Sequence, residues 1–246
     1  MACVSRDKQP SPRSIQFRAS RGLPYLRIEG RPNLLVSFIS TFPATLFLVL
    51  AITAIALVTR AIGHAHFQNM LDALGFDLAA LKHGRFYVLP LGPLIQDRPG
   101  LHWKVVLLII VVACFVGPLE YLARPWRAAA TYFLTDSVST IGSTLLLWGL
   151  AALGSTRAHD YIHTPDLGSS SAAFGCAAAF AAMLPGRWRL AVTGGLAAYL
   201  LPSLIVVRHV FAVEHAIAAL TGFALGLLWR RAASRQTEQR GAEGAP

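Results

Sequence analysis

The octapeptide Gly-Ser-Ser-Ser-Ala-Ala-Phe-Gly at residues 168–175 decides how the rest of the chain is interpreted. It opens an apolar stretch that runs to Pro185, so its hydroxyl groups lie inside a segment typical of a membrane-spanning helix. Hydrocarbon does not solvate polar side chains, and those found in spans tend to face a bundle interior or a cavity. Serines in such helices also hydrogen-bond the carbonyl one turn back, or let two helices pack closely. The octapeptide alone therefore leaves both packing and chemistry open.

The composition is that of a membrane protein. The chain has 246 residues, of which 54% are hydrophobic and 14% charged. Its net charge of +10 comes from basic residues that separate apolar runs, a pattern that sets membrane topology and does not indicate nucleic-acid binding. The three cysteines form no close pair, so the sequence predicts neither a disulfide framework nor a metal site. The excess of Arg over Lys and the abundant Ala indicate a bacterial source.

Six apolar stretches are interpreted as membrane spans. They cover residues 34–59, 103–122, 127–153, 167–184, 190–207 and 211–229. A basic N-terminal tail (1–33), two basic turns and a polar C-terminal tail (231–246) alternate with connections of mixed charge. The positive-inside rule therefore predicts a multi-pass plasma-membrane protein with both termini in the cytoplasm. The expected fold is an all-α membrane protein with one six-span domain over residues 34–230.

The connection between the first two spans contains an amphipathic pattern. Apolar residues recur there at helical spacing, which predicts a helix lying in the membrane interface: Phe67, Met70, Leu71, Leu74, Leu78 and Leu81. Residues 84–95 follow and contain Pro90 and Pro93, which predict a half-buried irregular loop.

Ser170 and His215 are predicted to share one depth in the membrane. With the rise of an α-helix, Ser170 lies about 26 Å from the cytoplasmic Arg187, and His215 about 23 Å from Arg230. His102, at the start of the second span, lies closer to the outer surface. A neutral imidazole within hydrogen-bond reach of a serine can take its proton and make it a nucleophile. The sequence thus indicates a candidate Ser–His pair near the outer face.

Small residues lie on the same spans as the candidate pair. Ala218 and Gly222 follow His215 at intervals of one helical turn, and Gly168 and Gly175 lie on the fourth span. Such stripes let neighbouring helices approach closely, which would draw the two polar groups together. Ordinary close packing without any chemistry explains the same stripes.

The order of these features resembles that of the rhomboid family of intramembrane serine proteases. Residues 168–175 are similar to the family's Gly-x-Ser-Gly segment, which implies that Ser170 is the nucleophile. Residues 214–222 are similar to its Ala-His-x-x-Gly-x-x-x-Gly segment, which implies that His215 is the base. The resemblance implies a rhomboid-like bundle, a Ser–His dyad that needs no cofactor, and a transmembrane protein as substrate.

Three further parts of the chain carry the resemblance. His102 falls where the family has the histidine that opens the second span, and Glu120 where it has the acidic residue that closes it. Residues 71–94 look like the family's first loop. The resemblance implies that His102 and the Ser170 amide stabilise the oxyanion. Ser171 either crowds this oxyanion site or supplies a replacement hydroxyl to it.

The chain departs from the family pattern at three positions. Val106 stands where rhomboids usually have an asparagine, Ser171 replaces a glycine, and Glu214 replaces a small residue. Loss of one oxyanion donor typically lowers the rate by ~10²–10³. These departures favour an alternative, in which the protein is a catalytically inactive rhomboid-like protein that binds transmembrane helices.

Acidic residues inside the spans permit a third interpretation. Asp136 lies near the middle of the third span, where it can orient a histidine, relay protons, or be satisfied by neighbouring hydroxyls. Together with Glu214 and His215 it would suit a proton-coupled transporter, but the chain has neither an internal repeat nor matched broken helices. The His and Asp residues of 159–166 lack zinc-ligand spacing and are interpreted as a solvated loop.

Overall fold

The computed structural model describes residues 27–28, 31–32, 41–61, 64–96, 103–163, 167–207 and 210–243. Residues 1–40 form a unit of their own, in which strand β1 (Arg27–Ile28) pairs antiparallel with strand β2 (Arg31–Pro32). The described residues from Thr41 onward are almost entirely helical. The predicted all-α class is therefore confirmed for this part of the chain.

Among the described residues, four helical segments are long and apolar enough to cross a membrane, judged by length and composition. They are α2 (Pro43–Ala61), α5 (Trp103–Leu122), Gly186–Ile205 within α9 (Gly186–Pro202) and the π-helical η3 (Ser203–Val207), and Phe211–Arg235 within α10 (Val210–Glu243). Helix α8 (Ser170–Met183) is apolar but shorter, and α6 (Pro125–Ala152) is longer but rich in buried hydroxyl groups. Helix α10 continues to Glu243, so most of the predicted polar tail is helical.

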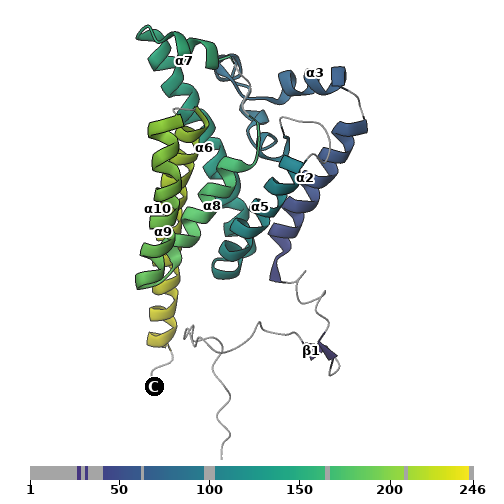
Figure 1. Cartoon of the computed structure of the whole chain (residues 1–246). Helices are drawn as coiled ribbons and strands as arrows, with labels where there is room; N and C mark the ends of the chain where they lie inside the picture. The colour runs from purple at the N-terminus through teal and green to yellow at the C-terminus, as the bar shows by residue number, and fades with distance from the viewer. Residues whose placement is uncertain are drawn as a thin grey trace, which may run out of the picture. The chain divides into compact units, whose positions relative to one another are not determined.

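Helix α8 lies at the centre of the helical unit, where it packs against α5, α6 and α10 (Figure 1). Most of its residues are buried, and most of these are alanines. A Cβ on Gly175 would overlap the side chain of Thr135 in α6, and a Cβ on Gly222 in α10 would overlap the backbone of Gly175. Ala218, one turn before Gly222, is fully buried. The small residues therefore bring the backbones of α8 and α10 into contact and let the Thr135 side chain of α6 pack against the backbone of α8.

Glu120 joins the end of α5 to the start of α2. Its buried carboxylate accepts the N–H groups of Ala44 and Thr45, both at 2.8 Å, and the Thr45 hydroxyl at 2.7 Å. The first N–H groups of a helix have no acceptor within the helix, and a negative charge there complements the helix dipole. Glu120 thus acts as an N-terminal cap supplied by a different helix.

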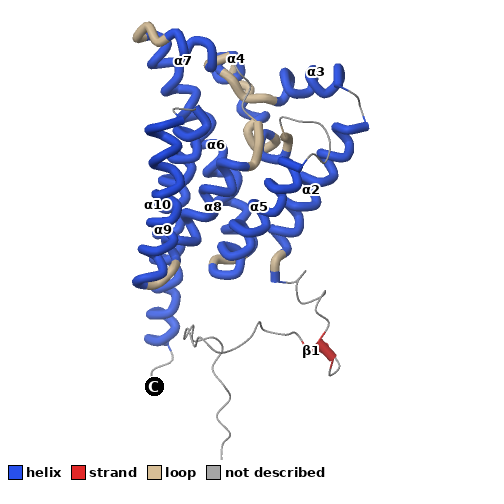
Figure 2. Tube along the Cα trace, in the orientation of Figure 1, coloured by secondary structure: helices blue, strands red, loops and turns tan. Residues whose placement is uncertain are grey.

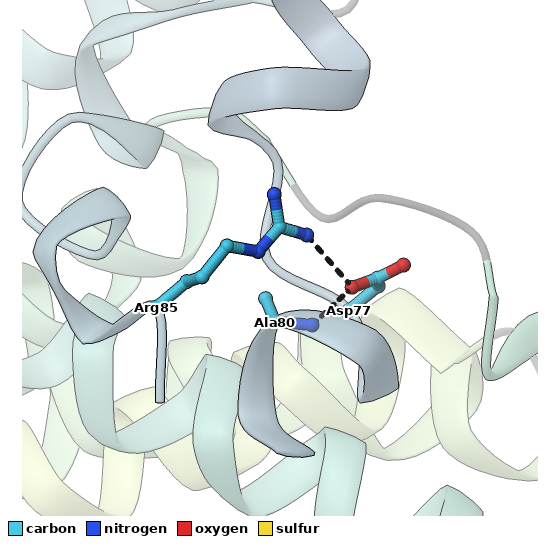
Figure 3. Close-up of polar contacts among 3 residues, drawn as sticks. All are labelled: Asp77, Ala80 and Arg85. Atoms are coloured by element: carbon cyan, nitrogen blue, oxygen red, sulfur yellow. Dashed lines mark hydrogen bonds and ion pairs between the residues drawn. The ribbon is translucent and has the colours of Figure 1, made fainter. Parts of the chain in front are cut away.

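The amphipathic segment predicted over residues 67–81 forms two helices, so the expectation of one continuous helix is wrong. Helix α3 (His64–Leu74) ends before Gly75, and α4 (Leu78–Lys82) begins after Asp77. The Asp77 carboxylate accepts the Ala80 N–H at 2.7 Å and lies 3.7 Å from Nη2 of Arg85 (Figure 3). An Asp that caps a backbone N–H favours a helix start over a helix interior.

The segment after α4 is the half-buried irregular loop that the prolines predicted. It contains two short 3₁₀ helices, η1 (Phe86–Val88) and η2 (Gly92–Leu94), with the turns drawn in tan in Figure 2. Val88, Pro93 and Ile95 are buried, and the Tyr132 hydroxyl in α6 donates to the Pro93 carbonyl at 2.9 Å. The loop is therefore fixed against the helical unit on the side where α8 begins.

Candidate functional site

Ser170 and His215 lie within hydrogen-bond distance of each other. Ser170 is the first residue of α8, and His215 lies in the second turn of α10. The Ser170 Oγ is 3.0 Å from Nε2 of His215, and both side chains are partly exposed. With Nδ1 protonated, Nε2 accepts the serine proton, which is the direction that nucleophilic attack by Oγ requires.

The position of Ser170 at the start of α8 supplies backbone donors beside its hydroxyl. The first N–H groups of a helix have no carbonyl one turn earlier to bond, and they carry the positive end of the helix dipole. Such groups stabilise a negative oxygen that forms next to them. The amide of Ser170, which we expected to contribute to an oxyanion site, belongs to this set by its place in the helix.

Phe174 holds the imidazole from one side. Its ring centroid is 4.7 Å from that of His215, with 31° between the planes. Phe174 also stacks on Tyr199 of α9 at 5.3 Å and meets Phe115 of α5 edge-on at 6.0 Å. We did not predict this role from the sequence, although the spacing of four residues from Ser170 places Phe174 on the same helix face.

Gly168 lies before α8 and not on its packing face, so our prediction of a helix-packing role for it is wrong. Its φ of +129° is a conformation that favours glycine, and it turns the chain into the helix. The Gly168 N–H donates to the Gly92 carbonyl at 3.1 Å, and Gln96 Nε2 donates to the Ser169 Oγ at 3.4 Å. The loop from η2 to Gln96 therefore holds the two residues that precede Ser170.

Ser171 points to Glu214 and away from the reacting pair. The buried Ser171 hydroxyl donates to Oε1 of Glu214 at 2.5 Å, which ties the first turn of α8 to α10. A hydroxyl held by a carboxylate is a poor donor to an oxyanion, so this contact argues against the predicted oxyanion role of the Ser171 side chain. Glu214 accepts this hydrogen bond next to His215 in the chain, and the polar support that we expected from it stays a prediction.

Among the other predicted residues, only those that the structure describes can be placed relative to the Ser170–His215 contact. His102 lies outside the described residues. Val106 is 43% exposed and has no polar side-chain atom. Asp136 is buried and, with Thr140 and Gly168, lines a cavity of about 10 Å³, the space of roughly one water molecule. Asp136 thus lies beside the turn that leads into α8.

Comparisons of the chain with protein-family models, with curated proteins and with solved structures found no match. Function is therefore inferred from the side chains and their geometry. The contact with the most direct chemical meaning is the one between Ser170 and His215.

Proposed function

We propose that the chain is an intramembrane serine protease of the rhomboid type, with six spans and both termini in the bacterial cytoplasm. It hydrolyses a peptide bond of a membrane-anchored protein near the outer face of the plasma membrane. The observation that carries this proposal is the 3.0 Å contact between the Ser170 Oγ and the His215 Nε2. The partial exposure of both side chains supports access for water and substrate.

The reaction uses the pair as a dyad. His215 takes the proton of the Ser170 hydroxyl while Oγ attacks the carbonyl carbon of the scissile bond. The tetrahedral intermediate collapses, the C–N bond breaks, and the protonated His215 gives its proton to the leaving amine. Water, deprotonated by His215, then attacks the acyl-enzyme ester and releases the new carboxyl end together with the free Ser170 hydroxyl.

The oxyanion is stabilised by backbone N–H groups at the start of α8, with His102 as a second donor. Val106 contributes no donor, so we expect a kcat that is lower by a factor of ~10²–10³ than that of a site with all donors present. Phe174 keeps the imidazole in place while its charge changes, since a cation is attracted to an aromatic face.

A second candidate is a catalytically inactive rhomboid-like protein that binds transmembrane helices. The hydrogen bond from Ser171 to Glu214 favours this candidate, because a hydrogen-bonded side chain occupies the position where the family has a glycine. In that case the Ser170–His215 contact serves only to join α8 to α10.

The test is cleavage of a single-span reporter by the purified protein in proteoliposomes. We expect cleavage by the wild-type protein, none by Ser170→Ala or His215→Asn, and normal cleavage by Ser139→Ala, which removes a buried serine of α6. Cleavage by Ser170→Ala at the wild-type rate would contradict the proposed protease function. Folded protein that cleaves nothing, yet retains the reporter helix equally well in wild-type and Ser170→Ala form, would establish the second candidate.

A further inference from the structure

An arginine lies beside two tryptophans at the start of α6, away from the Ser170–His215 pair. The Arg127 Cζ is 5.3 Å from the ring centroid of Trp126 and 5.1 Å from that of Trp229 on α10. The two rings meet edge-on at 5.5 Å, and the Trp229 indole N–H donates to the Thr131 hydroxyl at 3.3 Å. The indoles therefore lie close enough to the guanidinium group for cation–π contacts with both rings.

The charge of Arg127 is buried without a counter-ion. The side chain is only 9% exposed, and its Nε is buried with no hydrogen-bond partner. Within the part of the chain that the structure describes, no carboxylate forms an ion pair with Arg127. Aromatic faces attract the cation but do not bond its in-plane N–H donors, so the buried Nε still needs an acceptor.

The described residues at this end of α6 add positive charge around Arg127. Arg127 lies in the first turn of α6, where the helix dipole is already positive. Arg124, which precedes this helix, and Arg230, next to Trp229, are both exposed. An anion at the guanidinium edge would satisfy both the charge and the unmet Nε donor.

We propose that Arg127, next to Trp126 and Trp229, binds a phosphate ester that carries net negative charge. The planar guanidinium matches two phosphate oxygens at once, which a point charge does not. Paired tryptophans beside basic residues are also typical of the depth at which lipid headgroups lie. The ligand is an anionic phospholipid headgroup or a free phosphate compound, and the site is independent of the proposed protease.

The test measures lipid retention by native mass spectrometry on the full-length protein, exchanged into phosphatidylglycerol or phosphatidylcholine. We expect the wild-type protein to retain phosphatidylglycerol about five- to tenfold more than phosphatidylcholine. Arg127→Gln should lose this preference. Arg127→Lys should keep only part of it, because lysine retains the positive charge but not the planar guanidinium group that bonds two oxygens at once. Arg124→Gln, the matched control at the same helix end, should retain it.

A separate arm distinguishes the source of the phosphate. Inorganic phosphate and glycerol phosphate are added to the delipidated protein while unfolding is followed by tryptophan fluorescence. Stabilisation by these solutes that requires Arg127, with no preference between the two lipids, assigns the site to a free phosphate compound. Equal retention of both lipids without such stabilisation would overturn the proposal, as would equal losses in Arg124→Gln and Arg127→Gln. If Arg127→Gln does not fold, Arg127→Lys provides the same comparison.

Discussion

Gly222 of α10 lies against the backbone carbonyl of Gly175 of α8, and a Cβ on Gly222 would overlap that oxygen. The contact brings the two helix backbones together a short distance along the chain from Ser170 and His215. Because the hydroxyl and the imidazole come from different helices, their separation depends on this crossing. The geometry of the candidate site is therefore set by two residues that have no side chain.

We predict that Gly222→Ala separates α8 from α10. Overpacking of this kind costs ~1–3 kcal/mol, so the midpoint of thermal unfolding in detergent should fall by several degrees. Gly194→Ala in α9 is the control, because no atom lies within 4 Å of the added Cβ. Equal midpoints for the two variants would mean that the crossing is not as tight as described.

Replacement of Glu120 should destabilise the protein without touching the reacting pair. Glu120→Ala leaves two backbone N–H groups and one hydroxyl of α2 without their acceptor. Hydrogen bonds to charged groups contribute ~1.5–3 kcal/mol, so we expect a loss of at least that size in the free energy of unfolding. Glu120→Gln retains one acceptor oxygen, so its free energy of unfolding in denaturant titrations should lie between those of the wild-type protein and Glu120→Ala. Wild-type stability of Glu120→Ala would contradict the capping role.

Loss of the aromatic ring at position 174 should lower the rate of the reaction while the protein stays folded. Phe174→Leu keeps an apolar side chain but removes the face that contacts His215, and a displaced catalytic group can cost up to ~10² in rate. The reporter assay should therefore show a lower kcat with a nearly constant KM. Phe180→Leu, on the same helix and packed against the core, serves as the control and should react normally. If Phe174 had a purely structural role, Phe174→Leu and Phe180→Leu would lower the kcat to the same extent.

Ser171 and Glu214 should behave as a structural pair. Ser171→Ala removes a hydroxyl bound to a buried carboxylate, which we expect to lower the free energy of unfolding by ~1–3 kcal/mol while cleavage persists. A double-mutant cycle with Glu214→Gln measures their coupling. Loss of cleavage in a fully stable Ser171→Ala protein would place this hydroxyl in the reaction after all.

Much of the helical arrangement follows from the sequence because it depends on local pattern. The helix over residues 103–122 has its predicted bounds, and a constant rise per residue was enough to place Ser170 and His215 at one level. The break at Gly75 was missed because the apolar spacing continues across it, although Asp77 carries a capping signal.

The partners of the buried polar groups did not follow from the sequence. Counting along a helix gives depth but not the direction in which each side chain points relative to its neighbours. For this reason the sequence predicted neither the hydrogen bond from Ser171 to Glu214 nor the contact between the Phe174 and His215 rings. Both depend on how α8 and α10 are rotated against each other, which is a property of the assembled helices.

The most direct measurement of the central claim is covalent labelling of the purified protein by a fluorophosphonate, with the adduct located by peptide mass spectrometry. We predict one adduct on Ser170 in the wild-type protein and almost none on Ser170 in a folded His215→Asn variant. A folded wild-type protein without an adduct on Ser170, or equal labelling of Ser170 in both proteins, would contradict it.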